Sequence, residues 1–187
     1  MMKITGGKYA RMNISSVPDK RTRYTPAIVR EALFNMVNVE GMDILELFGG
    51  SGIVSAEALS RSAESVTIVE ISKSSCDTIR KNLSRFEGRI KILNIDFRIA
   101  LRRLARQKFD LIFADPPFGT GLLIEAFNEI DKHTDILNKD GIIVIESFEK
   151  ELPPDHGRSI YLINRKTYGD VILNFYEKQV ETTDSDQ

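Results

Sequence analysis

Short apolar runs alternate with amphipathic stretches along most of the chain, and this pattern predicts an alternation of strands and helices. The apolar runs predict strands at residues 43–48, 66–70, 90–95, 109–114 and 141–147. Between them, apolar residues at helical spacing predict helices at about 53–61, 73–85, 98–107 and 122–133. Strands connected in this way lie parallel and are joined by right-handed crossovers. We therefore expect an α/β fold with a doubly wound, Rossmann-like sheet that binds its ligands outside the carboxyl ends of the strands.

The first forty residues follow a different pattern. Residues 3–17 look extended, with Gly6 and Gly7 at a turn, so we expect a short β-hairpin arm there. Thr25 and Pro26 then predict the start of a helix, with Thr25 as the N-cap and Pro26 in the first helical position. The buried face of this helix is expected to hold Val29, Leu33, Met36 and Val37, with Arg30 and Glu31 elsewhere on the helix.

The C-terminal part contains two strand-like runs, at residues 159–164 and 170–176, separated by residues 165–169. This spacing predicts a hairpin that adds an antiparallel edge to the mostly parallel sheet. The last nine residues are polar and acidic, which is typical of disorder. The expected organisation is an arm of residues 1–24, a main domain of residues 25–178 and a tail of residues 179–187.

The charge distribution singles out the N-terminal part. Composition is ordinary for a globular domain, with 42% hydrophobic and 28% charged residues among 187. Residues 1–30 contain seven lysines and arginines against Asp19, a net charge of +6, so the remainder carries −7 of the total of −1. A basic arm on an acidic body favours contact with a phosphate backbone. A solvated basic flank without a partner is the alternative.

Other sequence features exclude some classes of protein. Cys76 is the only cysteine, so no disulfide can form within the chain. His133 and His156 are isolated, and we expect no metal site. No apolar run is long enough for a membrane span and no signal peptide is evident, so we expect a cytoplasmic protein with no membrane partner. Small size without an apolar excess favours a monomer.

An acid and two prolines end the fourth predicted strand of the sheet. Neither Pro116 nor Pro117 can donate an N–H, and Pro117 restricts Pro116 to extended backbone. The carboxylate of Asp115 and the carbonyl of Pro116 therefore remain as acceptors beside the flat apolar ring of Phe118. This set suits a planar ring that carries an exocyclic amino group. A simple turn is the alternative, because aspartate and proline both favour turns.

A glycine-rich loop, Glu46-Leu-Phe-Gly-Gly-Ser-Gly52, follows the first predicted strand of the sheet. Glycines there let the backbone approach a ligand closely. The dinucleotide-binding form has Gly-x-Gly-x-x-Gly, but here Ser55 stands in the place of the third glycine. Glu46 would also repel a pyrophosphate and attract a cation. The loop therefore argues against NAD and for a positively charged cofactor.

Two further acids end the next two predicted strands. Glu70 comes eighteen residues after Gly52, where an acid typically accepts the ribose hydroxyls of a bound nucleoside. Asp96 can accept from an adenine amino group, or it can simply cap the helix that follows. A nucleoside site with a cation near Glu46 has the composition of S-adenosylmethionine.

The order of these motifs resembles the class I methyltransferases that carry an [Asn/Asp]-Pro-Pro-[Phe/Tyr] motif and methylate exocyclic amines or amides. Two N-terminal segments, Ile4-Thr-Gly-Gly7 and Val29-Arg-Glu-Ala-Leu-Phe-Asn35, are similar to those of the RsmD family. That family methylates N2 of a guanine in bacterial 16S ribosomal RNA. The resemblance implies a class I methyltransferase sheet, S-adenosyl-L-methionine as cofactor, and 16S rRNA in the small ribosomal subunit as partner.

The resemblance also implies roles for individual residues. The catalytic group is expected to be Asp115, Pro116, Pro117 and Phe118. Cofactor contacts are expected from Glu46, Phe48, Gly49, Gly50, Gly52, Glu70, Asp96, Phe97, Thr25 and Arg30. RNA contacts are expected from Lys3, Lys8, Arg11, Lys20, Arg21, Arg23, Lys166 and Tyr168.

Three other functions share parts of this pattern. DNA adenine-N6 methyltransferases carry Asp-Pro-Pro but usually have a separate target-recognition domain, for which this chain has no length. Protein-glutamine methyltransferases typically have Asn-Pro-Pro-Tyr. A non-catalytic RNA-binding module on the same fold is the third alternative, and the four acids Glu46, Glu70, Asp96 and Asp115 argue against a decayed site.

Overall fold

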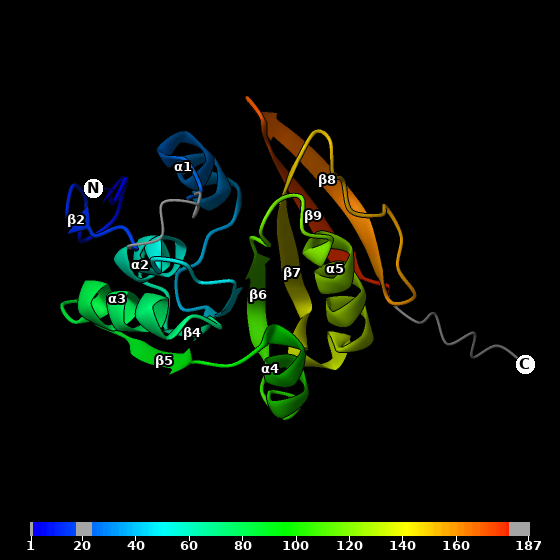
Figure 1. The fold of residues 1–187 in the computed structure, drawn as a ribbon, viewed down its shortest axis with the longest axis horizontal. Coiled ribbons are helices and arrows are strands. Elements are labelled where there is room, and N and C mark those ends of the chain that lie inside the picture. The colour runs from blue at the N-terminus through cyan, green and yellow to red at the C-terminus, as the bar shows by residue number, and fades with distance from the viewer. Residues whose placement is uncertain (1, 18–23, 180–187) are drawn as a thin grey trace, which may run out of the picture.

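A seven-stranded sheet forms the centre of the molecule in a computed structural model that describes residues 2–17 and 24–179. Its strand order is β5-β4-β3-β6-β7-β9-β8 (Figure 1). Strands β3 to β7 run parallel, and β9 and β8 are antiparallel. This confirms the doubly wound sheet with an antiparallel C-terminal hairpin. The strands are β3 (Asp43–Leu47), β4 (Ser65–Val69), β5 (Arg89–Leu93), β6 (Phe109–Ala114), β7 (Leu137–Phe148), β8 (Ile160–Tyr168) and β9 (Val171–Lys178).

Helices cover both faces of the sheet (Figure 1). The sheet separates the core into two apolar clusters, one beneath each layer of helices. One face is covered by α1 (Ala27–Met36), α2 (Ile53–Ser60) and α3 (Lys73–Leu83). The other is covered by α4 (Phe97–Arg103) and α5 (Leu122–Lys132), which leads into the 3-10 turn Thr134–Ile136. Within the described residues, no helix combines the length and apolarity that a membrane crossing needs.

The N-terminal segment forms the expected small hairpin and packs on the α2 side of the sheet. Strands β1 (Met2–Lys3) and β2 (Asn13–Ile14) pair antiparallel, and the apolar side chains of Ile4 and Ile14 join the same cluster as α1 and α2. The connection crosses the end of α2 so closely that a Cβ on Gly7 would meet the carbonyl oxygen of Ser60 at 1.9 Å. Only glycine fits there, and its φ is 77°.

The start of α1 differs from the prediction. Pro26 is the N-cap, and the hydroxyl of Thr25 donates to Glu146 instead of capping the helix. The buried face also differs, because Arg30 is buried in it while Met36 is 39% exposed. A buried arginine needs a matched partner, and the hydrophobic spacing alone could not reveal one.

That partner is Glu57 of α2. Arg30 Nε lies 3.2 Å from Glu57 Oε1, with both side chains almost fully buried. The two remaining guanidinium nitrogens donate to the carbonyl oxygens of Thr25 at 2.6 Å and Lys3 at 2.7 Å. Glu57 Oε1 also accepts from the backbone N–H of Thr5 at 2.7 Å. One ion pair therefore joins the hairpin, α1 and α2.

Some predicted boundaries also shift. The turn between β8 and β9 is shorter than residues 165–169, because Arg165–Tyr168 continue the strand and Gly169, with a φ of 60°, makes the reversal. Helix α4 ends at Arg103 rather than near 107. The predicted tail from 180 onward and the basic residues Lys20, Arg21 and Arg23 lie outside the described residues.

We expect Arg30→Ala to lower the free energy of unfolding by about 3 kcal/mol, because the buried Glu57 carboxylate loses its buried cation and keeps only Arg61, whose Nε lies 3.8 Å from its Oε2. Arg80→Ala is the matched control, since Arg80 pairs with Asp77 on the exposed surface of α3 and should cost less than about 1 kcal/mol. Urea unfolding followed by circular dichroism measures both. Equal losses in the two variants would contradict the structural role of the Arg30–Glu57 pair.

Candidate functional site

Three acids form a row along the carboxyl edge of the sheet. Strand β6 lies between β3 and β7, so Glu46, Asp115 and Glu146 come from neighbouring strands at the same edge. Side chains alternate between faces along a strand, and residues two positions earlier on each strand pack in the cluster beneath α1 and α2; these are Ile44, Phe113 and Val144. The three acids therefore project from the same face of the sheet.

Asp115 occupies the centre of this row. Its pKa is raised well above the usual range by burial and by the nearby charges of Glu146 and Glu46. Within the described residues, no group donates a hydrogen bond to its carboxylate. Pro116 and Pro117 follow without N–H groups, as the sequence predicts. The Asp115 carboxylate and the Pro116 carbonyl are thus acceptors at the open end of β6.

Glu46 lies on the β3 side of Asp115. Its Oε2 accepts from the backbone N–H of Ser55 at 3.1 Å and from the Ser55 hydroxyl. Burial raises the pKa of Glu46 to about 8, although the bonds from Ser55 act in the opposite direction. A carboxyl with such a pKa has too little positive charge around it, and a cationic ligand would supply that charge.

Glu146, on the β7 side, is a site residue that the sequence analysis did not identify. It is 3% exposed, and its Oε2 accepts from the Thr25 hydroxyl at 2.7 Å. Burial raises its pKa to about 7, against smaller opposing effects of Thr25 and Arg30. The sequence signal for it is an acid inside the apolar run 141–147. The strand pattern alone does not distinguish such an acid from an ordinary strand residue.

The glycine loop closes the β3 side of the site. Phe48, Gly50 and Gly52 all have positive φ, at 64°, 53° and 76°, so the chain turns sharply before α2. Glu70 holds this loop: its Oε2 accepts from Gly50 N at 2.9 Å and its Oε1 from Ser72 N at 2.7 Å. Each oxygen keeps a further lone pair, so Glu70 can still accept from a ligand.

Asp96 caps α4, which was the simpler of its two predicted roles. Its Oδ1 accepts from Arg98 N at 2.8 Å, and its Oδ2 from the Arg98 guanidinium at 2.7 Å. Phe97 is buried, with its ring centroid 4.9 Å from that of Phe48. Adenine contacts by Asp96 and Phe97 stay predictions. The geometry gives both residues a structural role at the base of the glycine loop.

Phe118 lies at the rim of the acid row. Its ring is 44% exposed and meets Phe148, at the end of β7, edge-on with centroids 5.0 Å apart. A partly exposed ring next to Asp115 can stack on a planar ligand. Arg30, in contrast, uses three nitrogens on protein partners, and the cofactor contact expected of it stays a prediction.

The basic residues predicted to contact RNA are spread over several places. Lys3, Arg11 and Lys166 are exposed, and Tyr168 is half-buried near the end of β8. Lys8 forms an ion pair with Glu87 at 2.6 Å. The described part of the chain thus offers cations on the hairpin and on β8, but it does not test their contacts.

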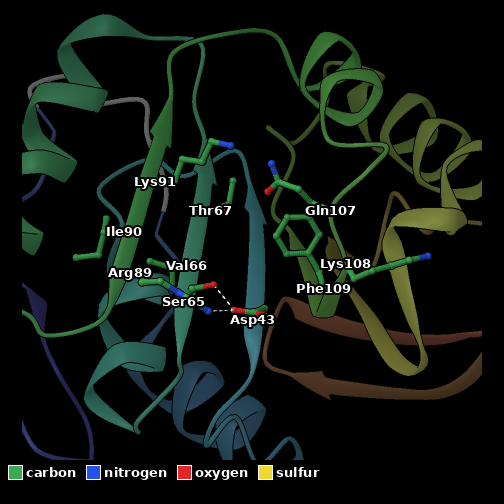
Figure 2. A pocket seen from close by; sticks show the side chains of 10 residues that line it. All are labelled: Asp43, Ser65, Val66, Thr67, Arg89, Ile90, Lys91, Gln107, Lys108 and Phe109. Atoms are coloured by element: carbon green, nitrogen blue, oxygen red, sulfur yellow. Dashed lines mark hydrogen bonds and ion pairs between the residues drawn. The ribbon is translucent and has the colours of Figure 1, made fainter.

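A hollow of about 350 Å³ lies at the amino-terminal edge of the sheet, opposite the acid row (Figure 2). Asp43 there accepts from Ser65 and pairs with Arg89 at 3.2 Å. Lys108 points away from the other cations and donates to the Asp135 carbonyl. Asp43 and Arg89 are thus paired with each other and Lys108 with a carbonyl oxygen beyond the hollow, so the acid row is the stronger candidate site. In the described residues, no three acid, imidazole or thiol side chains converge as metal ligands.

Comparison with known proteins gives a consistent result over nearly the whole chain. The model of the family described as "Conserved hypothetical protein 95" matches residues 2–177. "Putative rRNA methyltransferase YlbH" of Bacillus subtilis is 33% identical over 186 residues, covering 96% of this chain and 100% of the relative. "Ribosomal RNA small subunit methyltransferase D" of Escherichia coli K12 is 29% identical over 185 residues, covering 96% and 91%.

A solved structure agrees with these relatives. The one described as "Putative methyltransferase yhhF from Escherichia coli" has a TM-score of 0.79 and 30% identity, and the match covers 95% of this chain and 98% of that one. The fold is therefore common to nearly the whole of both chains.

We expect the stability of the protein to fall as pH rises from about 5 to about 8. An unfolded chain releases the Glu46 proton near its ordinary pKa of 4.5, whereas the folded protein keeps it up to a pKa of about 8. Glu46→Gln should flatten this decline by at least about 1 kcal/mol. The control is Glu40→Gln, on the exposed surface. Thermal unfolding across this pH range measures the effect, and a decline as steep in Glu46→Gln as in the wild type would contradict it.

Proposed function

The chain belongs to the Conserved hypothetical protein 95 family, the RsmD family of methyltransferases, and on this premise we propose that it transfers a methyl group from S-adenosyl-L-methionine to N2 of a guanine in 16S rRNA of the small ribosomal subunit. The observation that carries the proposal is Asp115, an acceptor without a described donor at the centre of the acid row. The printed names of the relatives support ribosomal RNA as the substrate class.

The site suits this cofactor. S-adenosyl-L-methionine supplies a methyl group on positively charged sulfur when bound. Glu46 has a raised pKa for want of nearby positive charge, so it favours the cationic part of such a ligand. Glu70 fixes the glycine loop and keeps lone pairs for the ribose hydroxyls. Glu46, in β3, would therefore bind the cationic part of the cofactor, and Glu70, directly after β4, its nucleoside.

Asp115 and the Pro116 carbonyl act on the acceptor nitrogen. They accept the two hydrogens of the guanine amino group, which withdraws its lone pair from the ring and stabilises the positive charge that grows on nitrogen during attack. Phe118 stacks on the base and fixes its plane. The nitrogen would gain the methyl carbon as the carbon–sulfur bond breaks, with that electron pair left on a neutral thioether, and would lose one proton, which Asp115 or water accepts. Holding the nitrogen in near-attack geometry supplies much of the acceleration.

The target guanine must leave its stack to enter this site. The N-terminal arm, residues 1–24, and the end of β8 carry exposed cations that would hold the neighbouring phosphates. Residues 25–178 then form the catalytic domain. The end of β8 lies near the carboxyl end of β7, because Val171 pairs with both Phe148 and Tyr168.

Replacement of Asp115 and Glu70 should separate catalysis from cofactor binding. We expect Asp115→Ala to lower kcat by about 100-fold or more with little change in cofactor affinity, because Asp115 contacts the acceptor. Glu70→Ala should weaken cofactor binding instead, because it frees the glycine loop and removes the ribose acceptor. Calorimetric titration and single-turnover kinetics measure the two effects. Parallel loss of affinity and rate in Asp115→Ala would contradict its role.

The experiment that tests the function uses radiolabelled cofactor. The protein is offered small ribosomal subunits that lack the modification, bare 16S rRNA and duplex DNA, and the labelled nucleoside is identified after digestion. We expect N2-methylguanosine from the subunits, with Asp115→Ala as the inactive control. Label in DNA adenine alone would replace the proposed substrate with a DNA adenine-N6 activity, and label in no nucleic acid would contradict the proposal.

A further inference from the structure

Glu146 lies on the β7 side of Asp115, whereas the expected cofactor contacts on the glycine loop lie on its β3 side. The sheet order β4-β3-β6-β7 puts the glycine loop and Glu70 beyond β3 and β4, and Glu146 on the opposite neighbour of β6. A ligand on the glycine loop fills the β3 side. A base whose amino group reaches Asp115 must then approach from the β7 side, and Glu146 is the acid it meets there.

The structure holds Glu146 in place through a chain of contacts. The Arg30–Glu57 ion pair fixes the guanidinium, which donates to the Thr25 carbonyl at 2.6 Å. The Thr25 hydroxyl then donates to Glu146 Oε2 at 2.7 Å. Within the described residues, no group donates to the other oxygen, Oε1. One half of the carboxylate is thus fixed and the other half has no protein partner.

A purely structural acid looks different in this protein. Asp131 is 7% exposed and uses both oxygens: Oδ1 accepts from Ser159 N and Ile160 N at 2.8 and 3.1 Å, and Oδ2 from Arg158 N at 2.8 Å. In the described part of the chain, Glu146 has no protein donor to Oε1, and Oε1 is not among the side-chain atoms that are both buried from solvent and unpaired. This oxygen is therefore open to a hydrogen bond from a ligand, unlike those of Asp131.

The edge of guanine matches such an acceptor. Guanine carries the N1–H donor directly beside its N2 amino group, whereas adenine has a lone pair at N1. With the two amino hydrogens on Asp115 and Pro116, the next donor along the edge is N1–H. We propose that Glu146 recognises the target base by accepting this N1–H, so that Asp115, Pro116 and Glu146 together select guanine; this role rests on the guanine-N2 function proposed above.

This assignment gives Thr25 and Arg30 a role in recognition of the base; the cofactor contacts expected of them stay predictions. Both are positioning residues, because Thr25 fixes one carboxylate oxygen so that the other faces the base. An adenine in the same place would set its N1 lone pair against Glu146 Oε1. A site built to pair with an N–H rejects an analogue that lacks it.

The test compares two target bases, guanine and 2-aminopurine, which keeps the amino group but lacks N1–H. Both are placed in reconstituted small subunits at the position that the wild type labels, and kcat/KM is measured for each. The wild type should prefer guanine by about 10- to 100-fold. Methionine is unbranched and similar in length to glutamate but lacks its carboxylate acceptor. In Glu146→Met we therefore expect the ratio of kcat/KM for guanine to that for 2-aminopurine to fall close to the ratio set by the intrinsic reactivities of the two amino groups.

Two further variants complete the test. Glu146→Gln keeps a carbonyl acceptor and should keep most of the preference. Glu149→Gln, an exposed acid just past β7, should behave as the wild type. If Glu146→Met fails to fold, Thr25→Val takes its place, because it releases Glu146 and should also reduce the preference. An unchanged ratio of guanine to 2-aminopurine in a folded Glu146→Met or in Thr25→Val would overturn the role of Glu146.

The outcomes separate the two proposals. If the wild type methylates no guanine at N2, the proposed function fails whatever Glu146 does. If the wild type produces N2-methylguanosine but the Glu146 variants keep its base preference, the function stands and the recognition role fails. Equal cofactor affinity in the folded Glu146 variants is expected, because Glu146 lies on the side of Asp115 away from the glycine loop.

Discussion

A row of carboxyl groups without matching cations is the constraint on which the rest of this site depends. Glu46, Asp115 and Glu146 come together at the carboxyl edge of three neighbouring strands, and all three have raised pKa values because burial penalises their charged forms. Among the described residues, Arg30 is the one lysine or arginine that is buried. Its charge is already matched by Glu57 at 3.2 Å. The site therefore lacks positive charge, and a cationic cofactor supplies what the protein does not.

The ion pair between Arg30 and Glu57 connects this acid row to the N-terminal hairpin. Through it, the hairpin, α1 and α2 share one buried network, and Thr25 is held against Glu146. A segment that the charge distribution marked as an RNA-binding arm is thus also part of the architecture of the site. The hairpin and the position of Glu146 are physically linked, because the same guanidinium donates to the carbonyl oxygens of Lys3 and Thr25.

The sequence predicts much of the fold and one side of the site, for identifiable reasons. Parallel strands are apolar on both faces, so their pattern is clear, and the ends of such strands locate Glu46, Glu70 and Asp115 without a structure. Glu146 could not be found in this way, because one acid in an apolar run reads as part of the strand. Arg30 was placed off the buried face because its partner lies 27 residues away in another helix. For Asp96, sequence alone left two roles open, and the geometry shows the helix cap.

The most direct test of this account is the affinity of the protein for S-adenosylmethionine compared with S-adenosylhomocysteine, which lacks the sulfonium charge. Calorimetric titrations from about pH 6 to about pH 8.5 span the pH range in which Glu146 and Glu46 ionise. The account predicts that the charged cofactor binds more tightly and that its advantage grows as pH rises. Equal affinities that do not change with pH would contradict a site organised around uncompensated carboxylates.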